Sequence, residues 1–403
     1  MLAVEEALER IVAGVTPLPS EWVHLGAAHG RVLATDLVAS RDQPPHAISA
    51  MDGYAVRAAD LASGSATLQL VGAAPAGGVF EGALGPGETV RIFTGGLLPT
   101  GADAIALQEN ATSDGERVRL EGRVESGAYV RPAGLDFERG EVALPAGKRL
   151  TARDIGFAAA LNHAWLPVRR KPRIAVLATG DELVMPGQPL QAHQIVNSNS
   201  AALAAMIATW GGEACDLGIA ADRPEALADV VSQLTGVDLV VSVGGASVGE
   251  RDLVRDVLGR HGLEIDFWQI AMRPGKPLMF GRIAGVPMLG VPGNPVSAGV
   301  CAVLFVRAAM CALQGLDPLP PEIPAVLGEP LGANDRRQDY LRARATRRED
   351  GRLEVHPAAK QDSSMLATFA RADCLIKRPP FAPAAPAGTP VSVVPLASGP
   401  IGV

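Results

Sequence analysis

Three glycine-containing loops of this sequence combine backbone N–H groups with polar side chains, as a small-anion site requires. Residues 179–182 (TGDE), 244–252 (GGASVGERD) and 290–297 (GVPGNPVS) each follow an apolar run that predicts a buried strand. In an open parallel sheet, ligands bind at loops that leave the carboxyl ends of the strands. Glycines let backbone N–H groups approach an anion, and a helix behind the loop adds a favourable dipole. The loops therefore predict a site for phosphate or another oxyanion.

Positive charge for such a site comes from Arg273 and Lys276, which flank a Pro-Gly turn in the segment MRPGKP. The chain has 36 Lys and Arg against 43 Asp and Glu, a net charge of −7, so a local basic cluster must hold any anionic ligand. The same balance makes the chain a poor candidate for non-specific nucleic-acid binding. The alternative is that both side chains are solvated surface charges, which their place on a rigid turn between two strand-like runs disfavours.

Acidic side chains accompany the same loops, at Asp181, Glu182 and Asp252. Their oxygens suit a divalent metal ion, or they could orient an attacking group. Two acids have a structural alternative, because Asp222 precedes Arg-Pro-Glu and Asp252 precedes a helical segment, and both positions are typical of a helix N-cap. Asp52, in SAMDGYAV, similarly predicts an Asp-Gly turn. Spacing alone leaves these alternatives open.

The elements that must position these residues fall into zones that differ in hydrophobic periodicity and in their content of Gly and Pro. Residues 1–40 predict a helix, with Val4, Leu8, Ile11 and Val15 on one face, followed by the strand-like run RVLATDLVA. Short alternating runs between Gly and Pro turns, such as ATLQLVGAA and ETVRIF, predict a small β domain. A helical stretch follows it, in KRLTARDIGFAAALNHA. The predicted domains are residues 1–40 with 141–170 (an N-terminal α/β linking domain), 41–140 (a β-rich lid or barrel), 171–316 and 317–403.

Residues 171–315 alternate strand and helix, which predicts a parallel sheet with helices on both faces. One helix is expected to start behind Asn199. The apolar run from Pro292 to Met310 contains polar residues and a proline, so we expect a buried helix and no membrane span. The last zone returns to β texture, with a short helix near residues 365–371.

Composition limits the class of protein further. The four cysteines show no CxxC spacing and the seven histidines form no HExxH pair, so neither a disulfide framework nor a zinc site is predicted. The first residues include acidic side chains and form an amphipathic helix, unlike a signal peptide. A reducing cytoplasm is the expected location.

The same loops belong to a longer series of motifs. These are PPHAISAMDGYAVR, IFTGGLLPTGADAI, VRPAGLDFERG, VLATGDELV, DLVVSVGGASVGERD, AMRPGKPLMFGR and GVPGNPVSA, and then RRQDYLRAR and QDSSMLATFARADCLI near the end. The series resembles the successive motifs of the MoeA/gephyrin family, in the family's order and over nearly the whole chain. Each motif by itself is weak, but this many in order are highly specific.

The resemblance implies an α/β multidomain fold with an elongated subunit. A central MogA-like, doubly wound α/β domain that binds molybdopterin is flanked by β-rich domains, the last a C-terminal β-barrel, and the subunits form homodimers. The implied activity is that of a molybdopterin molybdenumtransferase. It inserts molybdate into adenylylated molybdopterin, releases AMP and requires Mg²⁺, and a MogA-type adenylyltransferase is the implied partner.

The resemblance also implies roles for individual residues. Functional polar positions of the family match Asp52, Thr94, Asp136, Glu182, Asp222 and Asp252, of which Glu182 and Asp252 are the expected metal ligands. Substrate-binding positions match Gly244, Gly245, Ser247, Gly249, Arg273, Lys276, Pro292, Asn294, Pro295 and Ser297. In the last domain Arg337 and Ser363 are the nearest matches for an arginine and a serine near molybdate, with Arg336 and Ser364 as rivals.

The chain departs from the family pattern at two positions. Arg273 stands where the family often has Lys, which keeps the charge but changes its geometry. Gln269 stands where some relatives have a further Lys, so the site has one positive charge fewer. Molybdate and tungstate have nearly equal size and charge, so the sequence does not separate them.

Asp52 is far in sequence from Glu182 and Asp252. We therefore expect these acids to meet across a domain or subunit boundary, in a cleft shared by two subunits. Two other functions are alternatives to this one. A scaffold protein of this family goes with a long linker and a further fused domain, which this chain lacks. A MogA-like adenylyltransferase acting alone needs only the α/β domain, whereas this chain has more.

Overall fold

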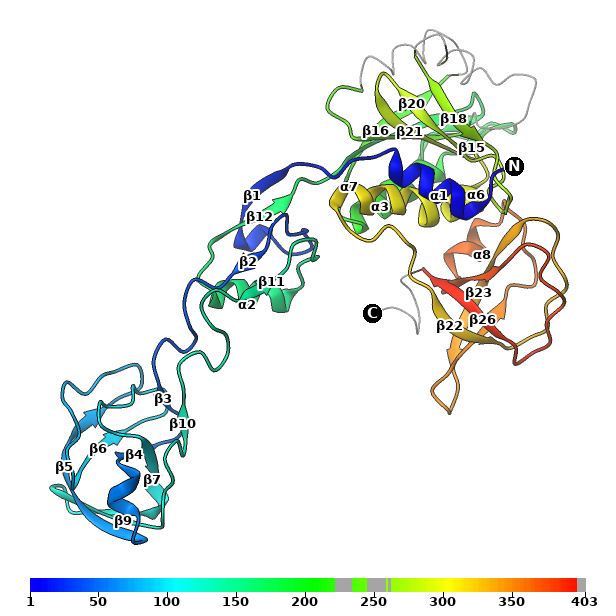
Figure 1. Ribbon diagram of the computed structural model, residues 1–403. Coiled ribbons are helices and arrows are strands. Elements are labelled where there is room, and N and C mark those ends of the chain that lie inside the picture. Colours follow the sequence, from blue (N-terminus) through cyan, green and yellow to red (C-terminus); the bar gives the residue numbers. More distant parts are fainter. Residues whose placement is uncertain (222–233, 245–258, 260–261, 397–403) are drawn as a thin grey trace. The chain divides into compact units, whose positions relative to one another are not determined.

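The computed structural model of the chain describes residues 1–221, 234–244, 259 and 262–396 (Figure 1). It divides into two compact units. The first contains Met1–Ala34, Gly147–Thr151 and Trp165–Val403, and the second contains Thr35–Ala146 and Ala152–Ala164. The chain thus leaves the first unit and re-enters it twice, so segments distant in sequence fold together. The four domain boundaries given above stay a prediction.

A six-stranded sheet forms the centre of the first unit. Its order is β16 (Glu213–Ala220), β13 (Arg173–Thr179), β17 (Leu239–Val243), β21 (Val286–Val291), β20 (Met279–Ile283) and β18 (Glu264–Trp268). The first four strands are parallel. Strands β13 and β17 are apolar almost throughout, and all their residues except Arg173 are buried, as expected of strands that are covered on both faces.

The predicted parallel sheet departs from the prediction at one edge, where β20 pairs antiparallel with both β21 and β18. The reason is the connection between β20 and β21, which consists of Ala284 and Gly285 alone. Both have positive φ, 48° and 81°, as a tight two-residue hairpin loop requires. A parallel neighbour needs a crossover connection of a dozen or more residues.

Three helical segments cover one face of this sheet (Figure 1). They are α1 (Val4–Ala13), α3 (Ser198–Thr209) and the continuous helix made of α6 (Pro295–Cys301), the π-helical turn η4 (Ala302–Val306) and α7 (Arg307–Gln314). The predicted face of α1 is confirmed, because Val4, Leu8 and Ile11 are buried. The helix from Pro295 to Gln314 is long and apolar enough to span a membrane, but its apolar window is 89% buried inside the structure. It is therefore the buried core helix that the sequence predicted.

The opposite face of the sheet carries a second apolar cluster that includes Ala175, Leu177, Val240 and Met288. The sequence predicted helices on both faces of the sheet, including two segments between β16 and β18. Those two segments, near residues 221–234 and 251–262, lie almost entirely outside the described residues, so that prediction stays untested.

The start of α3 differs from the prediction by two residues. Asn197, and not Asn199, is the N-cap, and its side-chain oxygen accepts a hydrogen bond from the Ser200 N–H at 3.2 Å. Asn199 is instead free to donate from Nδ2 to the Gly293 carbonyl at 2.7 Å. Asn199, which the spacing predicted as the cap, therefore binds a loop 94 residues away instead.

A small closed barrel ends the first unit. Its strands are β22 (Ile323–Leu327), β23 (Gln338–Arg347), β24 (Leu353–Pro357), β25 (Cys374–Arg378) and β26 (Pro390–Pro395), with the short helix α8 (Leu366–Ala370) before β25. Strand β23 pairs with both β24 and β25, which closes the ring. The predicted β-rich last domain and its short helix are confirmed. The two-residue strand β19 (Met272–Arg273) pairs with β23 and so ties the barrel to the α/β sheet.

A two-stranded ribbon of β1 (Ser20–His24) and β12 (Trp165–Arg169) completes the first unit. The sequence did not predict β1, and the run RVLATDLVA forms only isolated bridges at Val32 and Leu33 before the short β2. A small parallel pair, β14 (Leu183–Val184) and β15 (Ile195–Val196), follows the sheet strand β13.

The second unit is built on a six-stranded sheet, as its alternating runs predicted. The order is β7 (Ala104–Leu107), β4 (Gly53–Val56), β6 (Glu88–Ile92), β5 (Ser65–Ala74), β9 (Arg117–Glu121) and β8 (Ala111–Ser113). Two short ladders, β3 (Ile48–Ser49) with β10 (Val130–Arg131) and β2 (Leu37–Val38) with β11 (Val142–Leu144), accompany it. Helix α2 (Ala152–Ala160) is shorter than the helical stretch predicted from the sequence.

Candidate functional site

The first predicted loop follows β13 and the third follows β21, and of the second loop Gly244, at the carboxyl end of β17, is the described residue; these three strands are neighbours in the sheet. The Gly244 N–H donates to the Val291 carbonyl at 3.2 Å. A Cβ at Gly244 would lie 2.7 Å from the Thr179 carbonyl oxygen, and a Cβ at Gly293 would lie 3.7 Å from the Gly244 Cα. Gly244 also has φ +88°, which disfavours any side chain there. Glycine is thus required at Gly244, whereas a side chain at Gly293 would make only an ordinary contact with Gly244.

Glu182 lies on the first of these loops with its side chain exposed. Its carboxylate folds back over Gly180, where an added Cβ would lie 2.7 Å from both carboxylate oxygens. The Glu182 backbone carbonyl accepts from the Ile195 N–H at 2.9 Å, which holds the loop against β15. The carboxylate is therefore presented to solvent on a loop with a fixed backbone.

Several predicted residues lie outside the described part of the chain. These are Asp222, Gly245, Ser247, Gly249 and Asp252. Whether the two aspartates cap helices or act on substrate therefore stays a prediction.

The loop before α6 joins the barrel through Ser363. Asn294 donates from Nδ2 to the Ser363 hydroxyl at 3.0 Å, and the Val296 N–H donates to the Ser363 carbonyl at 3.0 Å. The rival Ser364 instead donates to the Asp362 carboxylate at 2.6 Å. The structure therefore places Ser363 against the loop and turns the Ser364 hydroxyl toward a local acid.

The prolines of this loop have separate local roles. Pro295 occupies the first turn of α6, where its missing N–H costs no helical hydrogen bond. Pro292 is buried beside the end of β21, and Ser297 is 5% exposed on the first turn of the helix. These residues fix the path of the chain into the helix and keep Ser297 at its start.

The two residues of the predicted basic pair, Arg273 and Lys276, have different partners in the structure. Arg273 binds the Asp339 carboxylate with two N–H groups, from Nε at 2.9 Å and from Nη2. Lys276 is half-buried, and within the described part of the chain its side chain has no hydrogen bond or ion pair. Gln269 has φ +69° and acts through its backbone, which accepts from the Leu2 N–H at 3.2 Å.

Lys276 follows a turn that packs on the core helix. A Cβ at Gly275 would lie 2.7 Å from the Cys301 sulfur, which itself lies 3.9 Å from the Gly275 carbonyl oxygen. Ser297 and Cys301 are four residues apart on α6, so they share one face of the helix. The turn that carries Lys276 therefore lies on the Ser297 face of α6.

Arg337, the predicted arginine of the barrel, is bound to a local acid. It donates to Asp335 from Nη2 at 2.7 Å and from Nε at 3.2 Å. The hydrogen bonds from Arg337 hold the pKa of Asp335 well below its usual range. Arg336 is exposed. Neither arginine is directed by such contacts toward Ser363.

Sequence reasoning missed Arg342, which lies on β23 and is 1% exposed. It donates from Nη2 to the Asp362 carbonyl at 3.1 Å, beside Ser363, and its buried Nε has no partner. Burial lowers its pKa. The alternation of β23 puts Arg342 and Arg344 on one face, so the strand pattern alone does not reveal which of them is buried.

Asp52 and Thr94 are in contact within the second unit. The Asp52 carboxylate accepts from the Thr94 N–H and from the Thr94 hydroxyl, both at 2.8 Å. These two hydrogen bonds lower the pKa of Asp52, with a smaller contribution from Arg91. The Arg91 guanidinium lies 4.9 Å from the ring centres of both Tyr54 and Phe93. Asp52 is therefore more than a local turn residue, because its side chain binds a loop 42 positions away.

Asp136, the third predicted polar residue of this unit, is exposed. Its N–H donates to the Gln43 carbonyl at 2.8 Å, so its backbone is held while its side chain faces solvent.

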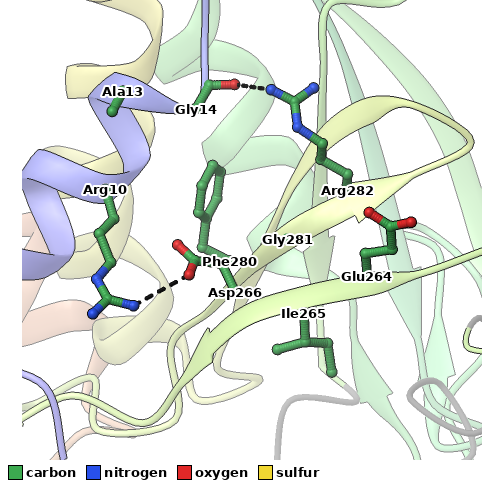
Figure 2. Close-up of a pocket in the computed structure, with 9 residues that line it drawn as sticks. All are labelled: Arg10, Ala13, Gly14, Glu264, Ile265, Asp266, Phe280, Gly281 and Arg282. Atoms are coloured by element: carbon green, nitrogen blue, oxygen red, sulfur yellow. Dashed lines mark hydrogen bonds and ion pairs between the residues drawn. The ribbon is translucent and has the colours of Figure 1, made fainter.

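A separate cavity of about 470 Å³ lies between α1 and the β18–β20 edge (Figure 2). Three of its charged side chains are engaged, because Arg10 binds Asp266 at 3.2 Å and Arg282 donates to the Gly14 carbonyl at 2.5 Å. Arg282 pairs with Pro287, near the start of β21, whereas the three loops lie at the other ends of the strands. This cavity is therefore distinct from the predicted site.

No cluster of three or more His, Cys, Asp or Glu side chains that could hold a metal ion exists among the described residues. The described site consists of glycine N–H groups, hydroxyls, an exposed carboxylate and two cations without ion pairs. On an α/β sheet, this combination is chemically suited to oxyanionic ligands at the strand ends.

Comparison of the chain with known proteins identifies the family to which it belongs. Residues 2–162 match the MoeA N-terminal region (domain I and II), residues 175–311 a probable molybdopterin binding domain, and residues 324–396 the MoeA C-terminal region (domain IV). The chain is 37% identical over 362 residues to a molybdopterin molybdenumtransferase of Nostoc, covering 86% of this chain and 81% of that relative. It is 33% identical to the Haemophilus influenzae enzyme of the same name over 381 residues, covering 93% and 94%.

A solved MoeA structure from Pyrococcus horikoshii superimposes with a TM-score of 0.86 at 30% identity, covering 98% of this chain and 99% of that one. The chain belongs to the MoeA family of molybdopterin molybdenumtransferases, enzymes of molybdenum-cofactor biosynthesis. The resemblance noted in the motif series is thereby confirmed, as is the multidomain fold with a central MogA-like domain between β-rich domains.

Proposed function

We propose that this chain inserts molybdate into adenylylated molybdopterin and releases AMP, in a reaction that requires Mg²⁺. The observation that carries the proposal is the junction between the loop before α6 and the barrel, where Asn294 binds Ser363. Two cations without ion pairs, Lys276 and Arg342, accompany this junction. An acidic chain needs such a local concentration of positive charge to hold a dianion.

Each group at the junction has a chemical role in this proposal. Lys276 and the guanidinium of Arg342 supply positive charge, and the Ser297 and Ser363 hydroxyls supply hydrogen-bond donors to molybdate oxygens. The glycine loops at Gly244 and Gly293 let the pterin substrate and its phosphates approach the backbone. The sheet and the barrel hold these groups on rigid elements, so the two reactants are oriented before they react.

Mg²⁺ fits the oxygen donors present. It binds proteins through one or two carboxylates and completes its coordination with water and substrate phosphates. The exposed carboxylate of Glu182 is the described ligand that would hold it, and we propose Asp252 as the second. When bound, Mg²⁺ would offset phosphate charge and weaken the phosphoanhydride.

We further propose that the active form is a homodimer in which Asp52, Thr94 and Asp136 of one subunit act on substrate held by the other. Asp52 is well suited to this role, because its hydrogen bonds to Thr94 keep it ionised. A MogA-type adenylyltransferase would supply the substrate in the cytoplasm. Mixing Asp52→Ala with Asp252→Ala subunits should then restore activity, and mixtures that stay inactive would remove the shared site.

The test of the reaction is incubation of the purified chain with adenylylated molybdopterin, molybdate and Mg²⁺. AMP release and reconstitution of a cofactor-free molybdoenzyme are the two measurements. Two arms serve as controls, one with molybdopterin that is not adenylylated and one with EDTA. Failure to form active cofactor with all components present would refute the proposal, and full activity with EDTA would refute its metal requirement. A tungstate arm measures the choice of metal.

A further inference from the structure

Four charged side chains form a balanced cluster where β19 pairs with β23. The cluster contains the arginines Arg273 and Arg337 and the aspartates Asp335 and Asp339. Two positive charges therefore face two negative charges. Both arginines were predicted from the sequence as ligands for an oxyanion, and both are engaged by protein carboxylates.

Asp339 is the buried member of this cluster. Its side chain is 3% exposed, whereas that of Arg273 is 46% exposed. Arg273 reaches it with Nε and Nη2, in the two-pronged geometry that guanidinium and carboxylate favour. The remaining Nη1 lies 3.9 Å from an Asp335 oxygen. All the terminal nitrogens of Arg273 are thus directed toward carboxylates.

Releasing Arg273 to bind a substrate anion would carry a double penalty. Asp339 would be left as a buried charge without its partner, which is strongly unfavourable. The incoming dianion would also lie near a carboxylate of the same sign that had lost its two hydrogen bonds from Arg273. Both penalties favour keeping Arg273 on Asp339 when the anion binds.

The backbone around the pair holds the turn that follows. Gln338 donates from its N–H to the Ala271 carbonyl at 2.9 Å, and the Ile270 N–H donates to the Lys276 carbonyl at 2.9 Å. Arg273 and Asp339 are direct neighbours in the ladder between β19 and β23. The two hydrogen bonds between the Arg273 and Asp339 side chains therefore hold the start of the turn that ends at Lys276.

We propose that Arg273 is a positioning residue, which acts by neutralising Asp339 and fastening the turn, while Lys276 is the residue of this turn that contacts the oxyanion. The proposal rests on the proposed function, in which molybdate binds at this turn. The sequence suggested equal roles for Arg273 and Lys276 as ligands of the anion, whereas this proposal gives them different roles. The arginine in place of the family's frequent lysine suits this role, since only a guanidinium gives the fork.

The test compares three variants of the full chain by molybdate binding in calorimetry and by KM and kcat for molybdate. Lys276→Met removes the proposed contact, and Arg273→Met removes the proposed counter-charge. The double variant Arg273→Met/Asp339→Leu removes both members of the pair, a replacement that buried ion pairs often tolerate. Arg352→Met, which removes an exposed ion pair with Asp350 elsewhere in the barrel, is the matched control.

We expect Lys276→Met to weaken molybdate binding by about tenfold or more, the loss of one charge-assisted hydrogen bond, with unchanged thermal stability. Arg273→Met should bind weakly and melt earlier. The double variant should recover binding to within about threefold of the wild type, because the carboxylate that Arg273 neutralised is gone. KM should follow these changes while kcat at saturating molybdate changes little. The Arg352→Met control should match the wild type throughout.

A double variant that binds as weakly as Lys276→Met would overturn the proposal, since it would mean that Arg273 itself touches the anion. Wild-type affinity in Lys276→Met would overturn it as well. If Arg273→Met does not fold, the molybdate affinity and KM of Arg273→Lys and of the double variant are compared with those of Lys276→Met and the wild type in the same way. A wild-type chain that neither binds molybdate nor forms cofactor would instead refute the proposed function, which keeps the two failures distinct.

Discussion

Asn294 and Ser363, 69 positions apart, join the α/β domain to the barrel through a 3.0 Å hydrogen bond between Asn294 Nδ2 and Ser363 Oγ. The Val296 N–H donates to the carbonyl of the same serine. Two bonds from one loop thus hold a single residue of the barrel. Ser363 stands next to Asp362, whose carbonyl binds the buried Arg342, so the contact also sets the place of that guanidinium.

We predict that Asn294→Ala raises the KM for molybdate by about tenfold, the loss of one hydrogen bond that orients the site. Asn294 is exposed, so the melting temperature should change little. Ser363→Ala should raise KM further, because it also removes the proposed hydroxyl donor to molybdate, and the double variant should be no worse than Ser363→Ala alone, because both substitutions remove the same bond. Ser392→Ala, which removes a hydroxyl from β26, is the control. Additive losses in the double variant would show that the two residues act separately.

The contact between Thr94 and Asp52 predicts a pH effect. Hydrogen bonds to the ionised form lower the pKa of Asp52 below its ordinary value of 3.8. Thr94→Val removes the hydroxyl donor, so the Asp52 titration followed by NMR should move up toward that value, whereas Thr94→Ser should not move it. Since the folded pKa is the lower one, the stability from this contact is present above the unfolded pKa and is lost as pH falls through the folded pKa. The melting difference between wild type and Thr94→Val should therefore disappear in acid.

A second pH effect follows from Asp335, whose pKa is held low chiefly by Arg337. The unfolded chain takes up this proton more readily, so stability from Asp335 rises with pH and is complete above the unfolded pKa. Asp335→Asn should melt earlier than the wild type at pH 7, and the gap should close as pH falls through the folded pKa. In an Arg337→Met background the same substitution should have a smaller effect. A gap that stays constant into acid would contradict the assignment.

The four cysteines predict a selective reaction with thiol reagents. Burial raises the pKa of the Cys301 and Cys311 thiols and raises that of Cys374 to about 12, and the thiolate is the reactive form. Cys215 is only half-buried. At pH 8 the native chain should show one readily reacting thiol, and Cys215→Ser should abolish it. Two or more fast thiols in the native chain would show that the buried sites open.

Much of the fold could be predicted from periodicity and turn residues. The apolar face of α1, the buried helix from Pro295 and the alternating strands of the barrel follow patterns that span one element each. The errors concern relations between elements. Asn199 has the side chain of a helix cap but binds Gly293, and the Ala284-Gly285 loop reverses a strand in a sheet expected to be parallel. Both depend on which neighbour lies alongside.

The site shows the same division. Its loops were predicted because glycine-rich segments after apolar strands are local features, and their meeting at one edge follows from parallel pairing. The choice between Ser363 and Ser364 was open, because adjacent serines differ only in where they point. Arg342 was missed because burial of a strand arginine depends on what covers it. For Asp222 and Asp252, which lie outside the described residues, the choice between a helix N-cap and a functional role stays open.

By itself the sequence determined the family, through many ordered motifs, and it determined the loops, glycines and prolines that an oxyanion site needs. It gave Arg273 and Lys276 equal roles in that site and missed Arg342. The tertiary structure decided which of them keep an unpaired charge, because a charge is neutralised by what lies within a few ångströms and by how deeply the pair is buried. The pairing of β19 with β23 brings Asp339 to Arg273 across 66 positions. No spacing in the chain reveals that contact, and it separates Arg273 from Lys276.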